Sequence, residues 1–204
     1  MDKFLDFREI EKECRKRYKK SPFSYEWSDK GIEIFFKDRQ ISYSHYVKLI
    51  IDEEYPYLQD MKLKWVIIGD FFEFLIKMCL LKENWNNLGM LYDSEKKEFY
   101  KFEVPKQLLM DSLKLKLENK KLTRIREILD FIQLQRNNFV HNPLAGMDHY
   151  AVEKQYLELI LLLNEKYSLN FLEEDLNKIN ERIKFIKLNS SGMDFEDKEL
   201  NKSD

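Results

Sequence analysis

The sequence predicts an all-α fold, a bundle of five or six helices that carries one or two small hairpin-like insertions. Apolar residues make up 44% of the 204 residues and charged residues 35%, a balance typical of helical, soluble proteins. Apolar side chains recur at spacings of three and four in several long segments, as on one helical face. Only five Gly and four Pro are present, too few for the turns of an all-β sandwich or barrel.

Composition also narrows the class of protein. One domain is expected over residues 1–188, followed by a flexible polar tail at 189–204. The N-terminus is charged and lacks the apolar segment of a signal peptide. The longest apolar stretch is interrupted by charged residues, so no membrane span is expected. The two cysteines form no CxxC pair, which predicts neither a zinc site nor a disulfide framework and favours a reducing cytoplasm.

The N-terminal third is expected to alternate between helices and a loop. Residues 2–19 look helical, and "SPFSYEWSDKG" ends that helix through Pro22 and a closing Gly31. "IEIFF" alternates enough for a short strand. Ser44 is placed as the N-cap of a helix over residues 45–54, ended by "YPY".

A long core helix is predicted over residues 62–82. Gly69 inside it lowers helix propensity and suggests close approach of a neighbouring helix. "LGMLYDSEKKEFYKFEV" then predicts two short strands around a polar turn. Further helices are expected at 122–140, 148–167 and 172–188. The apolar stripe of the core helix consists of Leu63, Ile67, Phe71, Phe74, Leu75, Met78 and Leu81.

An arginine breaks the apolar line of the helix at 122–140. A spacing of three and four places Leu122, Ile125, Leu129 and Ile132 inward, and Arg136 is the next position on that line. A buried guanidinium is costly unless it is paired or lies in a wet cleft. A specific interaction of Arg136, structural or catalytic, is therefore expected.

The same helix is expected to stop at His141. Pro143 disfavours helical geometry at Asn142, and a histidine at the negative end of the helix dipole is favoured in its protonated form. In a continuous helix, positions 136 and 141 point about 140° apart. The helix end allows His141 to fold back toward Arg136, which would give an Arg–His cluster.

This constellation resembles the HEPN domain family. "RNNFVH" fits the family's R-x4-6-H motif, in which the arginine is typically followed by a polar residue, here Asn137. HEPN domains are helical bundles with this motif at the C-terminal end of a long helix. An earlier core helix commonly carries polar residues facing the same cleft, and "GDFFEFLIK", with Asp70 and Glu73, is similar. The resemblance covers residues 40–165.

The resemblance implies a metal-independent endoribonuclease without a cofactor, often a toxin of a toxin–antitoxin pair or an effector of antiviral defence. The ribose 2′-hydroxyl would attack the adjacent phosphate, and His141 and Arg136 would serve proton transfer and charge stabilisation. Asn137, Glu73, Asp70 and Asn142 are the supporting candidates. A homodimer is implied, with RNA as substrate and an antitoxin or regulatory protein as a further partner.

Other interpretations remain open at this point. Arg136 and His141 can form a structural pair, either in a non-catalytic HEPN-like dimer that binds RNA, a nucleotide or a protein, or in an unrelated bundle. Arg39 and His45 also fit the R-x5-H spacing but lie in a predicted loop and helix start. The basic runs "CRKRYKK" and 106–126 could follow an RNA backbone, although most such runs are solvated helix faces.

Overall fold

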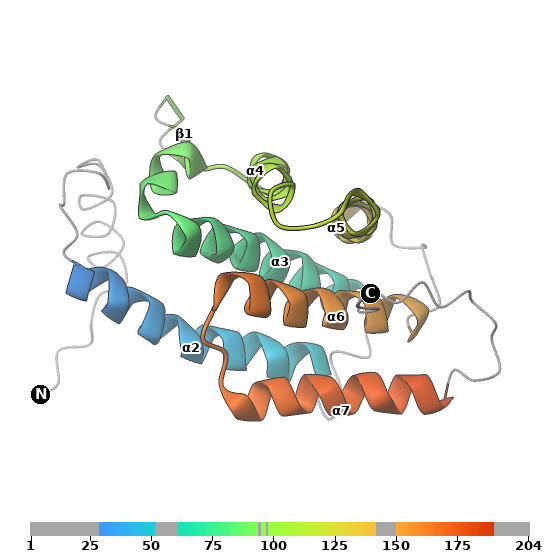
Figure 1. Cartoon of the computed structure of the whole chain (residues 1–204). Coiled ribbons are helices and arrows are strands. Elements are labelled where there is room, and N and C mark those ends of the chain that lie inside the picture. Colours follow the sequence, from blue (N-terminus) through green and yellow to red (C-terminus); the bar gives the residue numbers. More distant parts are fainter. Residues whose placement is uncertain (1–28, 52–60, 94, 97, 142–149, 190–204) are drawn as a thin grey trace, which may run out of the picture.

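The fold is helical, as predicted. The structure, a computed structural model, describes residues 29–51, 61–93, 95–96, 98–141 and 150–189 (Figure 1). The helix expected at 2–19 lies outside the described residues, and so does the tail expected at 189–204 except for Asn189, which is helical. The elements are α2 (Asp29–Ile51), α3 (Met61–Glu83), the 3-10 helix η3 (Trp85–Leu91), β1 (Tyr92–Asp93), β2 (Glu98–Phe99), α4 (Glu103–Leu113), α5 (Asn119–His141), α6 (Tyr150–Tyr167) and α7 (Glu173–Asn189).

Helix α3 forms the centre of the bundle. It packs against α2, α4, α5 and α6, and α7 closes the other side by packing on α2 and α6. In Figure 1, α3 lies along the picture plane while α4 and α5 are seen almost end on, so these two helices cross it. A helix covered on several sides must be apolar around most of its circumference. The buried residues of α3 are Trp65, Ile68, Phe71, Phe72, Leu75, Ile76, Met78, Cys79, Leu80 and Leu81.

Helix α2 corrects the prediction for the N-terminal third. The predicted strand "IEIFF" and the loop residue Gly31 both lie inside this helix. Its buried hydrophobic side chains, Phe36, Tyr43, Val47 and Ile50, follow a helical spacing of seven, four and three that extends beyond the short alternating run. Ser44 is not an N-cap, because the residue lies in the interior of α2. Its hydroxyl donates a hydrogen bond to the carboxylate of Asp175 in α7.

The predicted hairpin is confirmed. Strand β1 pairs antiparallel with β2, with Tyr92 opposite Phe99. The carboxylate of Asp93 accepts hydrogen bonds from the backbone N–H groups of Glu95 and Lys96, each at 3.0 Å, which stabilises the turn. Helix α4, which follows the hairpin, is missing from the sequence prediction. Among the described residues, no helix is long and apolar enough to cross a membrane.

Candidate functional site

Arg136 lies where the apolar line of α5 meets solvent. The inward line before it is confirmed, since Ile125, Leu129 and Ile132 are fully buried. The Arg136 side chain keeps 26% of its surface exposed. The unusual arginine is therefore neither a core residue nor a freely solvated one, and its charge has to be met by partners on the helix that α5 crosses.

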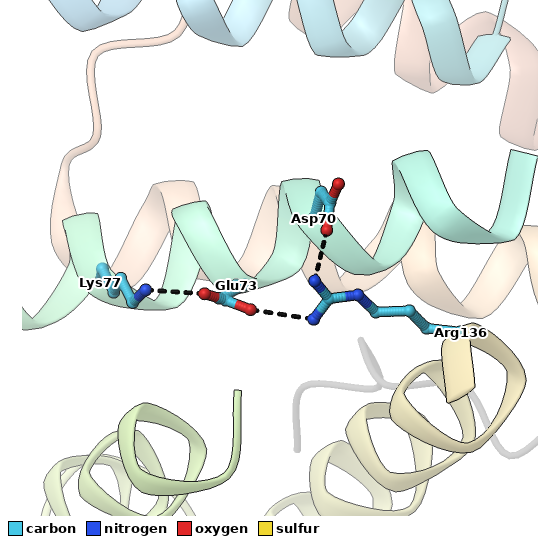
Figure 2. A network of polar contacts seen from close by, with 4 residues as sticks. All are labelled: Asp70, Glu73, Lys77 and Arg136. Carbon is cyan, nitrogen blue, oxygen red and sulfur yellow. Dashed lines mark hydrogen bonds and ion pairs between the residues drawn. The ribbon is translucent and has the colours of Figure 1, made fainter. Parts of the chain in front are cut away.

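Two carboxylates of α3 bind the Arg136 guanidinium, as Figure 2 shows. Its Nη2 lies 2.6 Å from Oδ1 of Asp70, and its Nη1 donates to Oε2 of Glu73 at 2.9 Å. The other carboxylate oxygen of Glu73 accepts a hydrogen bond from Nζ of Lys77 at 2.8 Å. Contacts of this length between ionised groups are stronger than neutral hydrogen bonds. The four side chains form a charge-balanced network between α3 and α5, here called the Arg136 cluster.

Gly69 makes room for the arginine. A Cβ atom at Gly69 would lie 2.5 Å from Cδ of Arg136 and 2.9 Å from its Cβ and Cγ. These distances are well inside van der Waals contact, so the aliphatic part of Arg136 rests directly on the backbone of α3. The predicted role of Gly69 in the approach of a neighbouring helix is confirmed. The glycine sits one residue before Asp70, which places the guanidinium between the two carboxylates.

The electrostatics of the Arg136 cluster favour an ionised Glu73. Partial burial raises the pKa of the Glu73 carboxyl. The hydrogen bonds and charges of Lys77 and Arg136 outweigh this effect, so the pKa lies below its ordinary value. The two carboxylates are unequally covered, because the Asp70 side chain is 46% exposed and that of Glu73 only 17%.

Tyr46 of α2 is a neighbour of this cluster that sequence reasoning missed. Burial raises the pKa of its phenol, and the negative charges of Asp70 and Glu73 raise it further. Its ring stacks on Phe71 and Phe74 of α3, with ring centroids 4.9 and 5.8 Å away. The hydroxyl therefore stays protonated at neutral pH beside two carboxylates. The sequence offers no signal for this, because Tyr46 joins the cluster only through the packing of α2 on α3.

The remaining predicted site residues lie around the end of α5. Asn137 is exposed next to Arg136. His141 is the last described residue of α5, and its side chain lies outside the described residues, so the helix end predicted there stays a prediction. Asn142 also lies outside them. The approach of His141 to Arg136 stays a prediction.

The lysine-rich run at 106–126 is largely occupied by internal pairs. Lys106 is buried, and its Nζ donates to Glu103, Asp130 and Gln133 at 2.7 to 2.9 Å. Three further cations of the run, Lys114, Lys116 and Arg124, each form an ion pair, with Asp111, Glu83 and Glu127 respectively. These carboxylates reduce the positive charge that the run offers to an RNA backbone. The other basic run, "CRKRYKK", lies outside the described residues.

The competing pair Arg39 and His45 lies entirely on α2. The Arg39 guanidinium stacks over the ring of Phe35 at 4.6 Å, and His45 is exposed. Arg39 therefore packs on an aromatic ring, whereas Arg136 is bound by carboxylates of a second helix.

Comparisons with known proteins found no match for this chain, neither among family models nor among curated proteins or solved structures. Within the part of the chain that the structure describes, no group of three or more His, Cys, Asp or Glu residues is arranged to hold a metal ion. The Arg136 cluster is the candidate functional site.

Proposed function

We propose that this chain is an endoribonuclease of the HEPN type that cleaves RNA without a metal ion. One observation carries the proposal: Arg136, on the inward line of α5, is held by Asp70 and Glu73 in a partly exposed position near the helix end. These carboxylates belong to "GDFFEFLIK", the segment that the resemblance pairs with the R-x4-6-H motif. His141 is the last described residue of the same helix.

The proposed reaction is an intramolecular phosphoryl transfer. The ribose 2′-oxygen bonds to the adjacent phosphorus, the bond from phosphorus to the 5′-oxygen breaks, and a 2′,3′-cyclic phosphate and a 5′-hydroxyl result. The 2′-hydroxyl loses a proton and the leaving oxygen gains one, and histidine titrates near the pH at which both transfers are needed. The guanidinium of Arg136 stabilises the charge on the phosphorane. DNA, which lacks the 2′-hydroxyl, is not a substrate.

The neighbouring side chains have positioning roles in this proposal. Asp70 and Glu73 orient the two nitrogens of the Arg136 guanidinium before RNA binds, and Asn137 contacts the phosphate or the histidine. As in other HEPN ribonucleases, the active unit is a homodimer in which two Arg–His pairs face one cleft. A toxin with its antitoxin, or an antiviral effector with its regulator, is the biological setting that this chemistry suits.

A second candidate function is a non-catalytic HEPN-like dimer that binds RNA, a nucleotide or a protein. The charge balance of the Arg136 cluster favours it: two cations and two carboxylates neutralise one another without any ligand. A purely structural arginine needs no more than this.

Cleavage of a labelled RNA in EDTA tests the first proposal against the second. Wild type should leave 2′,3′-cyclic phosphate ends, and His141→Ala should lower the rate by about 100-fold or more, because general acid–base catalysis contributes that much. His45→Ala is the matched control, since His45 is exposed and belongs to the competing motif on α2. An intact RNA pool after incubation with wild type, or equal rates for wild type and His141→Ala, would favour the binding module.

A further inference from the structure

The two carboxylates that hold Arg136 differ in how firmly they are held. Glu73 is 17% exposed, and its two oxygens contact two different cations, Arg136 and Lys77. Asp70 is 46% exposed, and Arg136 is its one ion-pair partner among the described residues. Glu73 is thus anchored on both sides, whereas Asp70 is held on one.

This difference matters because the two carboxylates bind different nitrogens of the Arg136 guanidinium fork, which consists of Nη1 and Nη2. Asp70 contacts Nη2 and Glu73 contacts Nη1. A phosphate binds a guanidinium through the same N–H groups that bind carboxylates. A phosphate that arrives from solvent therefore meets a fork whose more exposed contact is with Asp70.

Exchange at that position costs little. An ion pair with a carboxylate that is about half exposed contributes about 1 kcal/mol, because water replaces the lost contact. An Asp70 side chain that kept its place would repel the phosphate, since both groups are negative. Glu73 has no such freedom, because Lys77 fixes its second oxygen.

We propose that Asp70 is a displaceable partner of Arg136: a phosphate of the RNA backbone replaces it at Nη2, while Glu73 keeps the guanidinium in place. The inference rests on the proposed function for the identity of the ligand. In the unliganded protein Asp70 occupies the arginine, and it leaves when RNA binds. Asp70 thereby weakens RNA binding, and Glu73 supports it.

The test is RNA affinity after removal of the Asp70 charge. The probe is a short, labelled, single-stranded 2′-O-methyl RNA, which binds without being cleaved because the nucleophile is blocked. Asp70→Asn should bind it about fivefold more tightly than the control variant, which corresponds to about 1 kcal/mol. All titrations use one fixed low salt concentration, since phosphate contacts depend on salt.

Asp111→Asn is the matched control. Asp111 is 52% exposed and forms an ion pair of 2.6 Å with Lys114, so the variant removes the same charge from a similar pair elsewhere. Both variants alter the net charge equally, so a difference between them reports on Arg136 itself. Asp70→Glu, which keeps the negative charge, should bind no more tightly than wild type. Adding Arg136→Gln to Asp70→Asn should abolish the gain.

The outcomes separate the two proposals. A gain specific to Asp70→Asn supports displacement, even if wild type never cleaves unmodified RNA. Equal affinities of Asp70→Asn and Asp111→Asn, weaker binding by Asp70→Asn, or no binding by either variant overturns the displacement proposal. The ribonuclease stands in each of those cases if wild type still produces cyclic phosphate ends.

Discussion

Two arginines of this protein each bridge two helices by binding carboxylates, and they do so in contrasting surroundings. Arg182 of α7 binds both oxygens of Glu153 of α6, through Nε at 2.8 Å and Nη2 at 3.2 Å. Glu153 is fully buried and Arg182 is 10% exposed. Arg136 divides its fork between Asp70 and Glu73 and remains 26% exposed.

The difference separates a structural pair from a candidate site. A buried, bidentate pair has no route by which another anion could replace its partner, and breaking it leaves a charge without water. A partly exposed fork with two separate partners can lose one of them to a ligand and retain the other. Exposure and the division of the fork distinguish the two arginines, although both are bound by carboxylates.

The largest expected effect breaks the buried pair. Arg182→Met should lower the free energy of unfolding by about 3–5 kcal/mol, because the fully buried Glu153 loses its bidentate cation. Arg136→Met, the matched substitution at the exposed fork, should cost only about 1 kcal/mol, since water and Lys77 compensate its carboxylates. Urea unfolding of both variants measures the difference. Equal losses would show that the two arginines are not energetically distinct.

Gly69→Ala tests whether the packing of the Arg136 side chain on α3 stabilises the protein. The new methyl group overlaps the stem of Arg136, so the variant should lose about 1–3 kcal/mol of stability despite a better helix propensity. RNA binding should fall as well, because the fork is displaced. The same substitution in an Arg136→Ala background, where the stem is absent, should cost less. If Gly69→Ala alone were more stable than wild type and bound RNA normally, the close contact between position 69 and the Arg136 side chain would be contradicted.

The smallest effect concerns pH and the Glu73 anchor. Arg136 and Lys77 lower the pKa of Glu73 in the folded state, so the stability that this carboxylate contributes is present above its ordinary pKa. That contribution is lost as the pH falls through the lowered pKa of the folded carboxyl, which then becomes protonated. Glu73→Gln should therefore be less stable than wild type at neutral pH by at most about 1 kcal/mol.

Thermal unfolding of wild type and Glu73→Gln across the acid range supplies that measurement. The difference in stability between the two proteins should shrink as the pH falls, because Glu73 of the wild type then loses its charge and the glutamine of the variant has none to lose. A gap that is constant with pH would mean that Glu73 contributes through packing and not through its charge.

Long periodic segments made most of the fold predictable. Helices α3, α5, α6 and α7 were all expected, because their apolar residues repeat over several turns. "IEIFF" misled because five residues are too few to separate alternation from helical periodicity. The buried positions that decide the question, such as Tyr43 and Val47, lie further along α2. Helix α4 was missed because its first residues, Glu103 and Val104, end the segment predicted as a hairpin, and Pro105 follows directly.

The candidate site was predictable in part. Arg136 stood out because it interrupts an apolar line, and Asp70 and Glu73 because they share a face of the core helix. Both carboxylates pair with Arg136, as one of the two interpretations of that face expected, while their place at the border of a cleft stays a prediction. The burial of Lys106 could not be predicted, since Asp130 and Gln133 reach it only where α4 packs on α5.

The contact between Gly69 and Arg136 also constrains how this sequence can diverge. The two positions lie far apart in the chain, yet a side chain at 69 fits only after the residue at 136 has become shorter. They are therefore expected to change together in descendants of this chain. A glycine directly before an acidic residue in the core helix, together with an arginine at the end of a later helix, is a more selective search pattern for relatives than "RNNFVH" alone.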